Sequence, residues 1–69
     1  MEQFLIERIA EKAMKSNRKV RIELKDIEAG KDAFIEGKVD QIGPYSLVIS
    51  NNPYWQICRY ELIKWIETL

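Results

Sequence analysis

The spacing of apolar residues changes once along this chain, near residue 17, and this change constrains the fold more than any other feature. In the first segment, apolar side chains recur every three to five residues, which is typical of one face of an amphipathic helix. The residues on this face are Phe4, Leu5, Ile9, Ala13 and Met14. Ser16 and Asn17 both favour turns and mark the end of the segment. We therefore expect a helix over residues 2–16.

From residue 20 onward, apolar and polar residues alternate, which indicates strands with one buried face. Gly43-Pro44 and Asn51-Asn52-Pro53 are strong turn signals between such segments. Gly37 lies inside the second segment and is typical of a strand with a sharp bend or with another backbone segment close by. An interruption between the last two strands is expected at Tyr60-Glu61. The predicted strands cover residues 20–25, 33–42, 45–50, 54–59 and 62–67.

Short antiparallel strands, one of them bent, are typical of small and strongly curved barrels. The expected fold is one mainly β domain over residues 1–69. In it, the helix covers one end of a five-stranded, strongly bent antiparallel barrel over residues 20–67. SH3-like and OB-like barrels both fit this pattern. A polar loop over residues 26–32, which contains Gly30, is expected to join the first two strands.

Chain length and cysteine content limit how such a small domain is stabilised. A chain of 69 residues buries little surface. Cys58 is the single cysteine and histidine is absent, which excludes an internal disulfide and argues against a zinc site of the cysteine–histidine type. Self-association is the common device that remains. We expect Cys58 to be a buried small hydrophobe. The single cysteine predicts a reducing, cytoplasmic setting, and we find no leader and no long apolar run, which predicts a protein outside the membrane.

Charge is balanced over the chain but unevenly distributed. The net charge is zero, yet residues 1–25 carry seven lysines and arginines against four acids, and residues 26–69 carry four against seven. Such asymmetry is typical of a surface that faces a polyanion. A solvated helix face and loop explain it equally well, so both interpretations stay open.

Catalysis finds little support in the sequence. Without histidine, a serine or cysteine nucleophile has no ordinary imidazole base, and no glycine-rich phosphate loop is present. Several carboxylates cluster loosely and are interpreted as solvated surface or ion pairs: Asp26, Glu28, Asp32, Glu36 and Asp40. We therefore predict a protein that is not an enzyme and needs no cofactor or metal.

The pattern as a whole resembles the Sm/LSm family, and within it the bacterial Hfq-type proteins. The resemblance is carried by "VRIELKD", by Gly37, and by the segment "GKVDQIGPYSLVISNNPYWQICRYELIKWI" over residues 37–66. Four features depart from the general Sm pattern: Gly43 replaces an aspartate, an aliphatic Leu47 replaces the asparagine of eukaryotic and archaeal members as it does in Hfq-type proteins, Arg59-Tyr60 replaces the usual second-motif pair, and the loop around residues 26–33 is several residues longer than usual. These departures concern the usual uridine pocket more than the fold.

The resemblance implies a homo-oligomeric ring in which the fourth strand of one copy pairs with the fifth strand of the next. Exposed apolar strand edges favour such pairing. The expected interface residues are Tyr54, Trp55, Ile57, Ile63 and Trp65. Exposed stacking platforms are the alternative for the aromatic residues among them.

The resemblance also implies binding of short single-stranded RNA. Tyr45 falls where the family stacks a base, while Arg59 and Tyr60 match a pair that contacts phosphate or a base edge. Lys15, Arg18 and Lys19 match a basic rim patch that attracts phosphates. Each residue also has a plain structural interpretation, in strand packing, a loop contact or a solvated loop. The alternative function is an oligomeric protein-interaction or structural module that binds no RNA.

Overall fold

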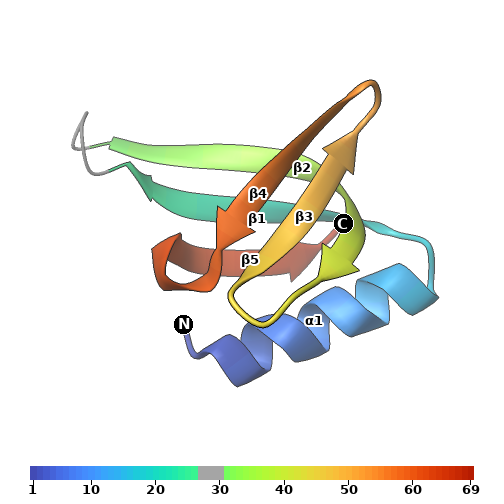
Figure 1. The fold of residues 1–69 in the computed structure, drawn as a ribbon, viewed down its shortest axis with the longest axis horizontal. Helices are drawn as coiled ribbons and strands as arrows, with labels where there is room; N and C mark the ends of the chain where they lie inside the picture. Colours follow the sequence, from blue (N-terminus) through green and yellow to red (C-terminus); the bar gives the residue numbers. More distant parts are fainter. Residues whose placement is uncertain (27–30) are drawn as a thin grey trace.

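The structure is a computed structural model that describes residues 1–26 and 31–69. It confirms the predicted fold class, because one N-terminal helix precedes five antiparallel strands (Figure 1). The elements are α1 (Gln3–Lys15), β1 (Lys19–Asp26), β2 (Lys31–Ile42), β3 (Ser46–Asn51), β4 (Tyr54–Arg59), the 3₁₀ turn η1 (Tyr60–Leu62) and β5 (Ile63–Thr68).

The strands form one sheet in the order β4-β3-β2-β1-β5. Every paired neighbour is antiparallel. Within the described residues β4 and β5 do not pair with each other, so the sheet is strongly bent but not closed into the predicted barrel. The order is consistent with the Sm-like bent sheet expected from the sequence, and it leaves β4 and β5 as the two edges.

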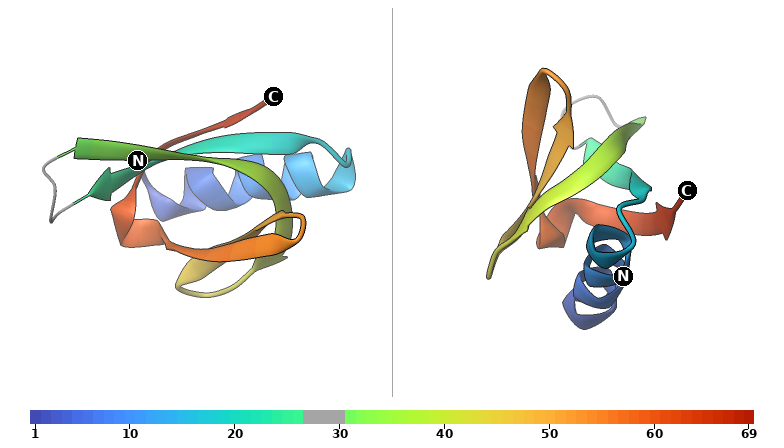
Figure 2. Two further views of the ribbon diagram at one scale, coloured as in Figure 1. Left: turned by 90° about the horizontal axis from the view of Figure 1, so that it is seen from above. Right: turned by 90° about the vertical axis from the view of Figure 1, so that its right-hand side faces the viewer.

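The bend lies in β2, as Figure 2 shows: the hairpin of β3 and β4 turns away from β1 and the first half of β2. Gly37 is the pivot. A β-carbon on Gly37 would overlap the carbonyl oxygen of Ser50 and lie 2.9 Å from a methyl carbon of Ile49. Only glycine allows β3 to approach β2 so closely, which confirms the close backbone approach predicted as one of the two alternatives at this residue. A register shift between Val39 and Gln41 follows it.

The helix α1 lies below the sheet (Figure 1) and packs against β2 and β5. Its buried residues are Ile6, Ala10 and Ala13. The predicted buried face was therefore partly wrong, because Phe4 is 61% exposed and Leu5 and Met14 are also exposed. The small side chains of the two alanines allow the helix backbone to approach the sheet. Phe4 is exposed, and the guanidinium carbon of Arg8 lies over its ring, 5.7 Å from the ring centre.

The core lies between α1 and the concave side of the sheet. Cys58 is buried there as predicted, and its burial raises the pKa of the thiol to about 11. The fully buried side chains of largest volume are Ile6, Val20, Ile22, Leu47, Ile49, Cys58 and Ile66. The alternation of apolar and polar residues in β1 and β3 therefore predicted correctly which side of each strand is buried.

The connection between the first two strands differs from the predicted loop. β1 continues through Asp26 and β2 begins at Lys31, so the ends of the predicted loop over residues 26–32 are paired backbone. Backbone N–H and C=O groups of two antiparallel strands can continue to pair into the residues that precede and follow their connection. The middle of the predicted loop, residues 27–30 with Gly30, lies outside the described residues.

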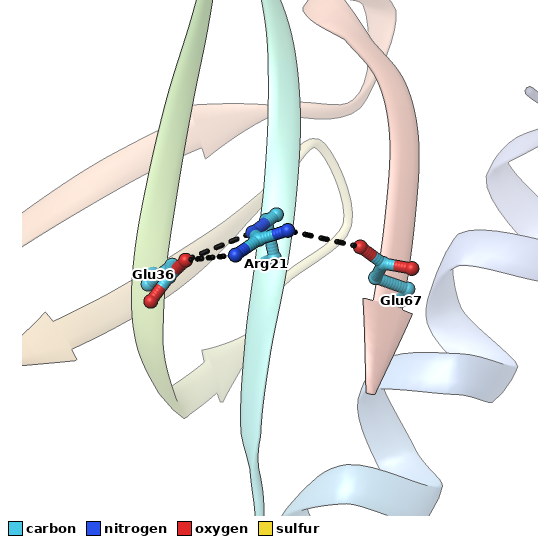
Figure 3. Close-up of polar contacts among 3 residues, drawn as sticks. All are labelled: Arg21, Glu36 and Glu67. Carbon is cyan, nitrogen blue, oxygen red and sulfur yellow. Dashed lines mark hydrogen bonds and ion pairs between the residues drawn. The ribbon is translucent and has the colours of Figure 1, made fainter. Parts of the chain in front are cut away.

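On the convex side, one arginine joins three strands (Figure 3). Arg21 of β1 donates from Nε to Glu36 of β2 at 2.8 Å, and its Nη1 lies 3.7 Å from Glu67 of β5. The register places these residues directly opposite one another. The hydrogen bond and charge of Glu36 raise the pKa of Arg21. Glu36 was predicted to be solvated surface or part of an ion pair, and it forms the ion pair.

Candidate functional site

A small hollow brings together residues from three separate parts of the chain. It has a volume of about 120 Å³ and is lined by Gln3, Tyr45, Arg59, Tyr60 and Glu61. Gln3 begins α1, Tyr45 belongs to the turn between β2 and β3, and the other three join β4 to η1. The structure thus places Tyr45, Arg59 and Tyr60, three of the predicted contact residues, around one hollow.

Hydrogen bonds from several directions fix the turn that carries Tyr45. The Gly43 N–H donates to the Ser46 carbonyl at 2.9 Å, and the Tyr60 N–H donates to the Tyr45 carbonyl at 3.1 Å. The Gln3 side-chain amide donates to the Pro44 carbonyl at 3.0 Å. The backbone of Tyr45 is therefore held in place while its side chain is not.

The two tyrosines of the hollow differ sharply in exposure. Tyr45 is 79% exposed, so its ring presents an open face. Tyr60 is 5% exposed, and its hydroxyl donates to the Gly43 carbonyl at 2.7 Å. Desolvation raises the pKa of Tyr60, and the negative charge of Glu7 raises it further. Tyr60 thus supports the hollow from the core, and its ring is not presented for stacking.

Arg59 has an acidic neighbour that we did not single out in the sequence. Its Nη2 lies 2.8 Å from Oε1 of Glu61, and both side chains are nearly two-thirds exposed. Glu61 lies two residues after Arg59 in the sequence, at the predicted interruption between strands. This spacing could have indicated the ion pair. Gln3 was also missed, and nothing in the sequence near it indicated the contact with Pro44.

The predicted basic rim residues lie apart from the hollow. Gln3 and Lys15 are at opposite ends of α1, which is roughly 18 Å long at 1.5 Å per residue. The exposed side chains of Lys15 and Lys19 lie near the far end. Arg18 Nε donates to the Leu69 carbonyl at 2.9 Å, so this arginine ties the end of the chain to the helix–strand junction.

The two sheet edges carry most of the predicted interface residues. On β4, Tyr54, Trp55 and Ile57 are exposed, and Trp65 is 53% exposed on β5. Trp55 borders two open grooves, of about 250 and 420 Å³. Ile63, by contrast, is 2% exposed and lies in the core, where it contributes to the packing of its own chain.

Two further searches of the structure concern metals and membranes. Among residues 1–26 and 31–69, no group of three or more histidine, cysteine or acidic residues could hold a metal ion. In the same residues, no helix is long and apolar enough to cross a membrane.

The fold and hollow define a small, mainly β protein with a helix at one end of an open bent sheet and a polar hollow beside an exposed tyrosine. Comparison of the sequence with protein-family models and with curated proteins finds no match. A function for this chain is therefore inferred from the residues of the hollow and from the sequence pattern.

Proposed function

We propose that the chain is a ring-forming, Sm-like RNA-binding protein that binds short single-stranded RNA by stacking a base on Tyr45. The observation that carries the proposal is the hollow that the exposed Tyr45 lines together with Arg59. Stacking on an aromatic ring contributes about 1–3 kcal/mol per base. The fixed backbone of Tyr45 supports this role, because a platform that is already positioned loses little entropy on binding.

Ring formation is the second part of the proposal. β4 and β5 are the two ends of the sheet, and unpaired edges that carry exposed aromatic residues favour pairing with another chain. Pairing β4 of one copy with β5 of the next is a head-to-tail contact, which closes into a ring when the rotation allows it. The grooves beside Trp55 would be partly covered by such a neighbour.

The basic residues have a supporting role. Lys15 and Lys19 would attract phosphates along the outer side of each subunit. The Arg18 side chain adds its charge there while it holds Leu69. A cytoplasmic location belongs to the same proposal, since the free thiol of Cys58 fits a reducing compartment.

Fluorescence anisotropy with labelled single-stranded RNA hexamers tests the site. Tyr45→Ala should weaken binding by about 5- to 150-fold, which is the stacking contribution expressed as affinity. Phe4→Ala is the matched control, because Phe4 is an exposed aromatic on α1 that lines neither the hollow nor the grooves beside Trp55. Binding should weaken with added salt. A Tyr45→Ala protein with unchanged assembly and full RNA affinity would remove the proposed site.

One observation favours a second function, an oligomeric protein-interaction or structural module without RNA. Glu61 offsets the charge of Arg59 within the hollow, and the net charge of the chain is zero. Native mass spectrometry separates the two functions, because it reports subunit number and bound RNA together. An assembled protein that retains no RNA of any composition would support this second function.

A further inference from the structure

The Arg59–Glu61 pair beside Tyr45 is unsuited to simple phosphate binding. The two side chains meet at 2.8 Å in the wall of the hollow. A carboxylate at this distance repels a phosphate and competes for the guanidinium. In the described part of the chain this is the one hydrogen bond or ion pair that either side chain makes, so the second oxygen of Glu61 and several N–H groups of Arg59 are left for a ligand.

A donor next to a carboxylate forms a pattern that one base complements. The Watson–Crick edge of guanine presents the O6 acceptor, then the N1–H donor and the N2 amino donor. Arg59 can donate to O6 from an N–H that does not pair with Glu61. Glu61 can accept from N1–H and the N2 amino group through its second oxygen and through the other lone pair of the oxygen that pairs with Arg59. Hydrogen bonds to charged groups are the stronger ones, and paired ones add geometric selectivity.

We infer that Arg59 and Glu61 make the hollow selective for guanine, with the purine ring stacked on Tyr45. The inference rests on the proposed RNA binding and identifies the base bound at that site. Arg59 and Glu61 are selectivity residues, and Tyr45 supplies stacking that is largely independent of the base.

The other bases fit the pair less well. Uracil places a carbonyl on each side of its single N–H, so at least one carbonyl oxygen would face the carboxylate of Glu61. Adenine can present its N6 amino group to Glu61 and its N1 lone pair to Arg59, which gives two hydrogen bonds where guanine gives three. Cytosine offers one amino group to Glu61, but its smaller ring overlaps Tyr45 less. Each of these bases therefore makes fewer hydrogen bonds to the charged pair than guanine does, and hydrogen bonds to charged groups are the stronger ones.

The hollow has the size and rigidity that selection of a single base requires. Its volume of about 120 Å³ admits one base edge and no more. The bond from Gln3 to Pro44 fixes one wall, and the buried Tyr60 fixes the floor through Gly43. Selection between bases depends on such fixed donors and acceptors, because a loose wall would adjust to any edge.

Anisotropy titrations with four RNA hexamers test the inference on the full-length protein. The hexamers are all uridine except for a third residue that is uridine, guanosine, adenosine or cytidine. The guanosine hexamer should bind at least about fivefold more tightly than each of the others, the lower end of the discrimination that a paired base contact gives. Glu61→Gln replaces one acceptor oxygen with a donor and should reduce this preference to less than about twofold.

Glu67→Gln is the matched control, because it removes the same charge from the convex side, where Glu67 faces Arg21. It should leave the guanosine preference intact. Equal binding of all four hexamers by the unmodified protein would overturn the guanine inference and leave the RNA site standing. Tighter binding of all four hexamers by Glu61→Gln, with their ranking unchanged, would also overturn it. Absence of binding to every hexamer would overturn the proposed function itself.

Discussion

The backbone of Ser50 in β3 lies against Gly37 in β2 so closely that any side chain at residue 37 would overlap its carbonyl oxygen. This contact sets the bend of β2 and therefore the position of the hairpin that ends beside the hollow. A substitution at Gly37 should displace β3 from β2, because the obstacle is backbone and cannot rotate away. The bend and the stability of the fold thus depend on the same residue.

We predict that Gly37→Ala destabilises the protein by about 1–3 kcal/mol, the usual cost of overpacking. Urea unfolding followed by tryptophan fluorescence measures this loss. Gly43→Ala is the control, since a β-carbon there would lie 3.2 Å from the Ser46 carbonyl oxygen and needs a smaller adjustment. Equal unfolding midpoints for Gly37→Ala and the unmodified protein would contradict the account of the bend.

The sequence predicted the elements well because their signals are local. Alternation of apolar residues is set by the two faces of a strand, and Gly37 marked the bend. The buried face of α1 was harder to predict, since Phe4, Leu5, Ile6, Ile9 and Ala10 follow one another too closely to define one stripe. Which of them is buried depends on how near the helix approaches the sheet.

The site was predictable only in part for a related reason. Tyr45 and Arg59 were found through a family pattern, but Glu61 and Gln3 join the hollow through three-dimensional packing. Gln3 meets Pro44 across 41 residues of sequence. Neither the spacing of apolar residues nor a turn-forming sequence indicates a contact between residues far apart in the chain, so only the structure could identify it.

The hydroxyl of Tyr60 should contribute measurably to stability. It donates to the Gly43 carbonyl at 2.7 Å from a largely buried ring, and loss of such a bond costs about 1 kcal/mol. Tyr60→Phe should lower the free energy of unfolding by that amount in urea titrations. Tyr54→Phe, which changes an exposed ring, should have no effect. Equal losses for the two variants would show that the bond to Gly43 carries no stability.

Stability should fall in alkaline solution because of Cys58. Burial raises its pKa to about 11 in the folded chain, from an ordinary value of 9.0 for an exposed thiol. Between these values the folded state holds the proton more tightly, so the unfolded state binds fewer protons and the free energy of unfolding decreases as pH rises. The contribution is complete below pH 9.0 and lost as pH passes about 11.

Cys58→Ala isolates the contribution of this thiol to the free energy of unfolding, because the variant lacks the thiol and keeps the other ionisable groups. Urea unfolding at neutral pH and at about pH 10 should show a smaller alkaline loss for Cys58→Ala than for the unmodified protein. The native thiol should also react slowly with the reagent DTNB, because the thiolate is the reactive form. Rapid labelling of folded protein at neutral pH would contradict the burial of Cys58.

The ion pairs of Arg21 should be unequal. Glu36 lies 2.7 Å from Arg21 Nη2, and Glu67 lies 3.7 Å from Nη1. Glu36→Gln should therefore lower the melting temperature more than Glu67→Gln. Both decreases should shrink at about 1 M salt, where charges are screened within about 3 Å. Thermal unfolding by circular dichroism provides the comparison, and a larger effect of Glu67→Gln at low salt would reverse the assignment.

Assembly should depend on the exposed indole of Trp65 at the β5 edge. If β5 pairs with β4 of another copy, Trp65→Lys places a charge in that contact, and an unpaired buried charge is strongly unfavourable. The variant should remain folded, because Trp65 is 53% exposed in the single chain, but should be a monomer by light scattering and native mass spectrometry. Phe4→Lys, an equally exposed aromatic on α1, should assemble normally. If both variants assemble as the unmodified protein does, the β5 edge is not the contact, and the pairing of β4 with β5 must be abandoned.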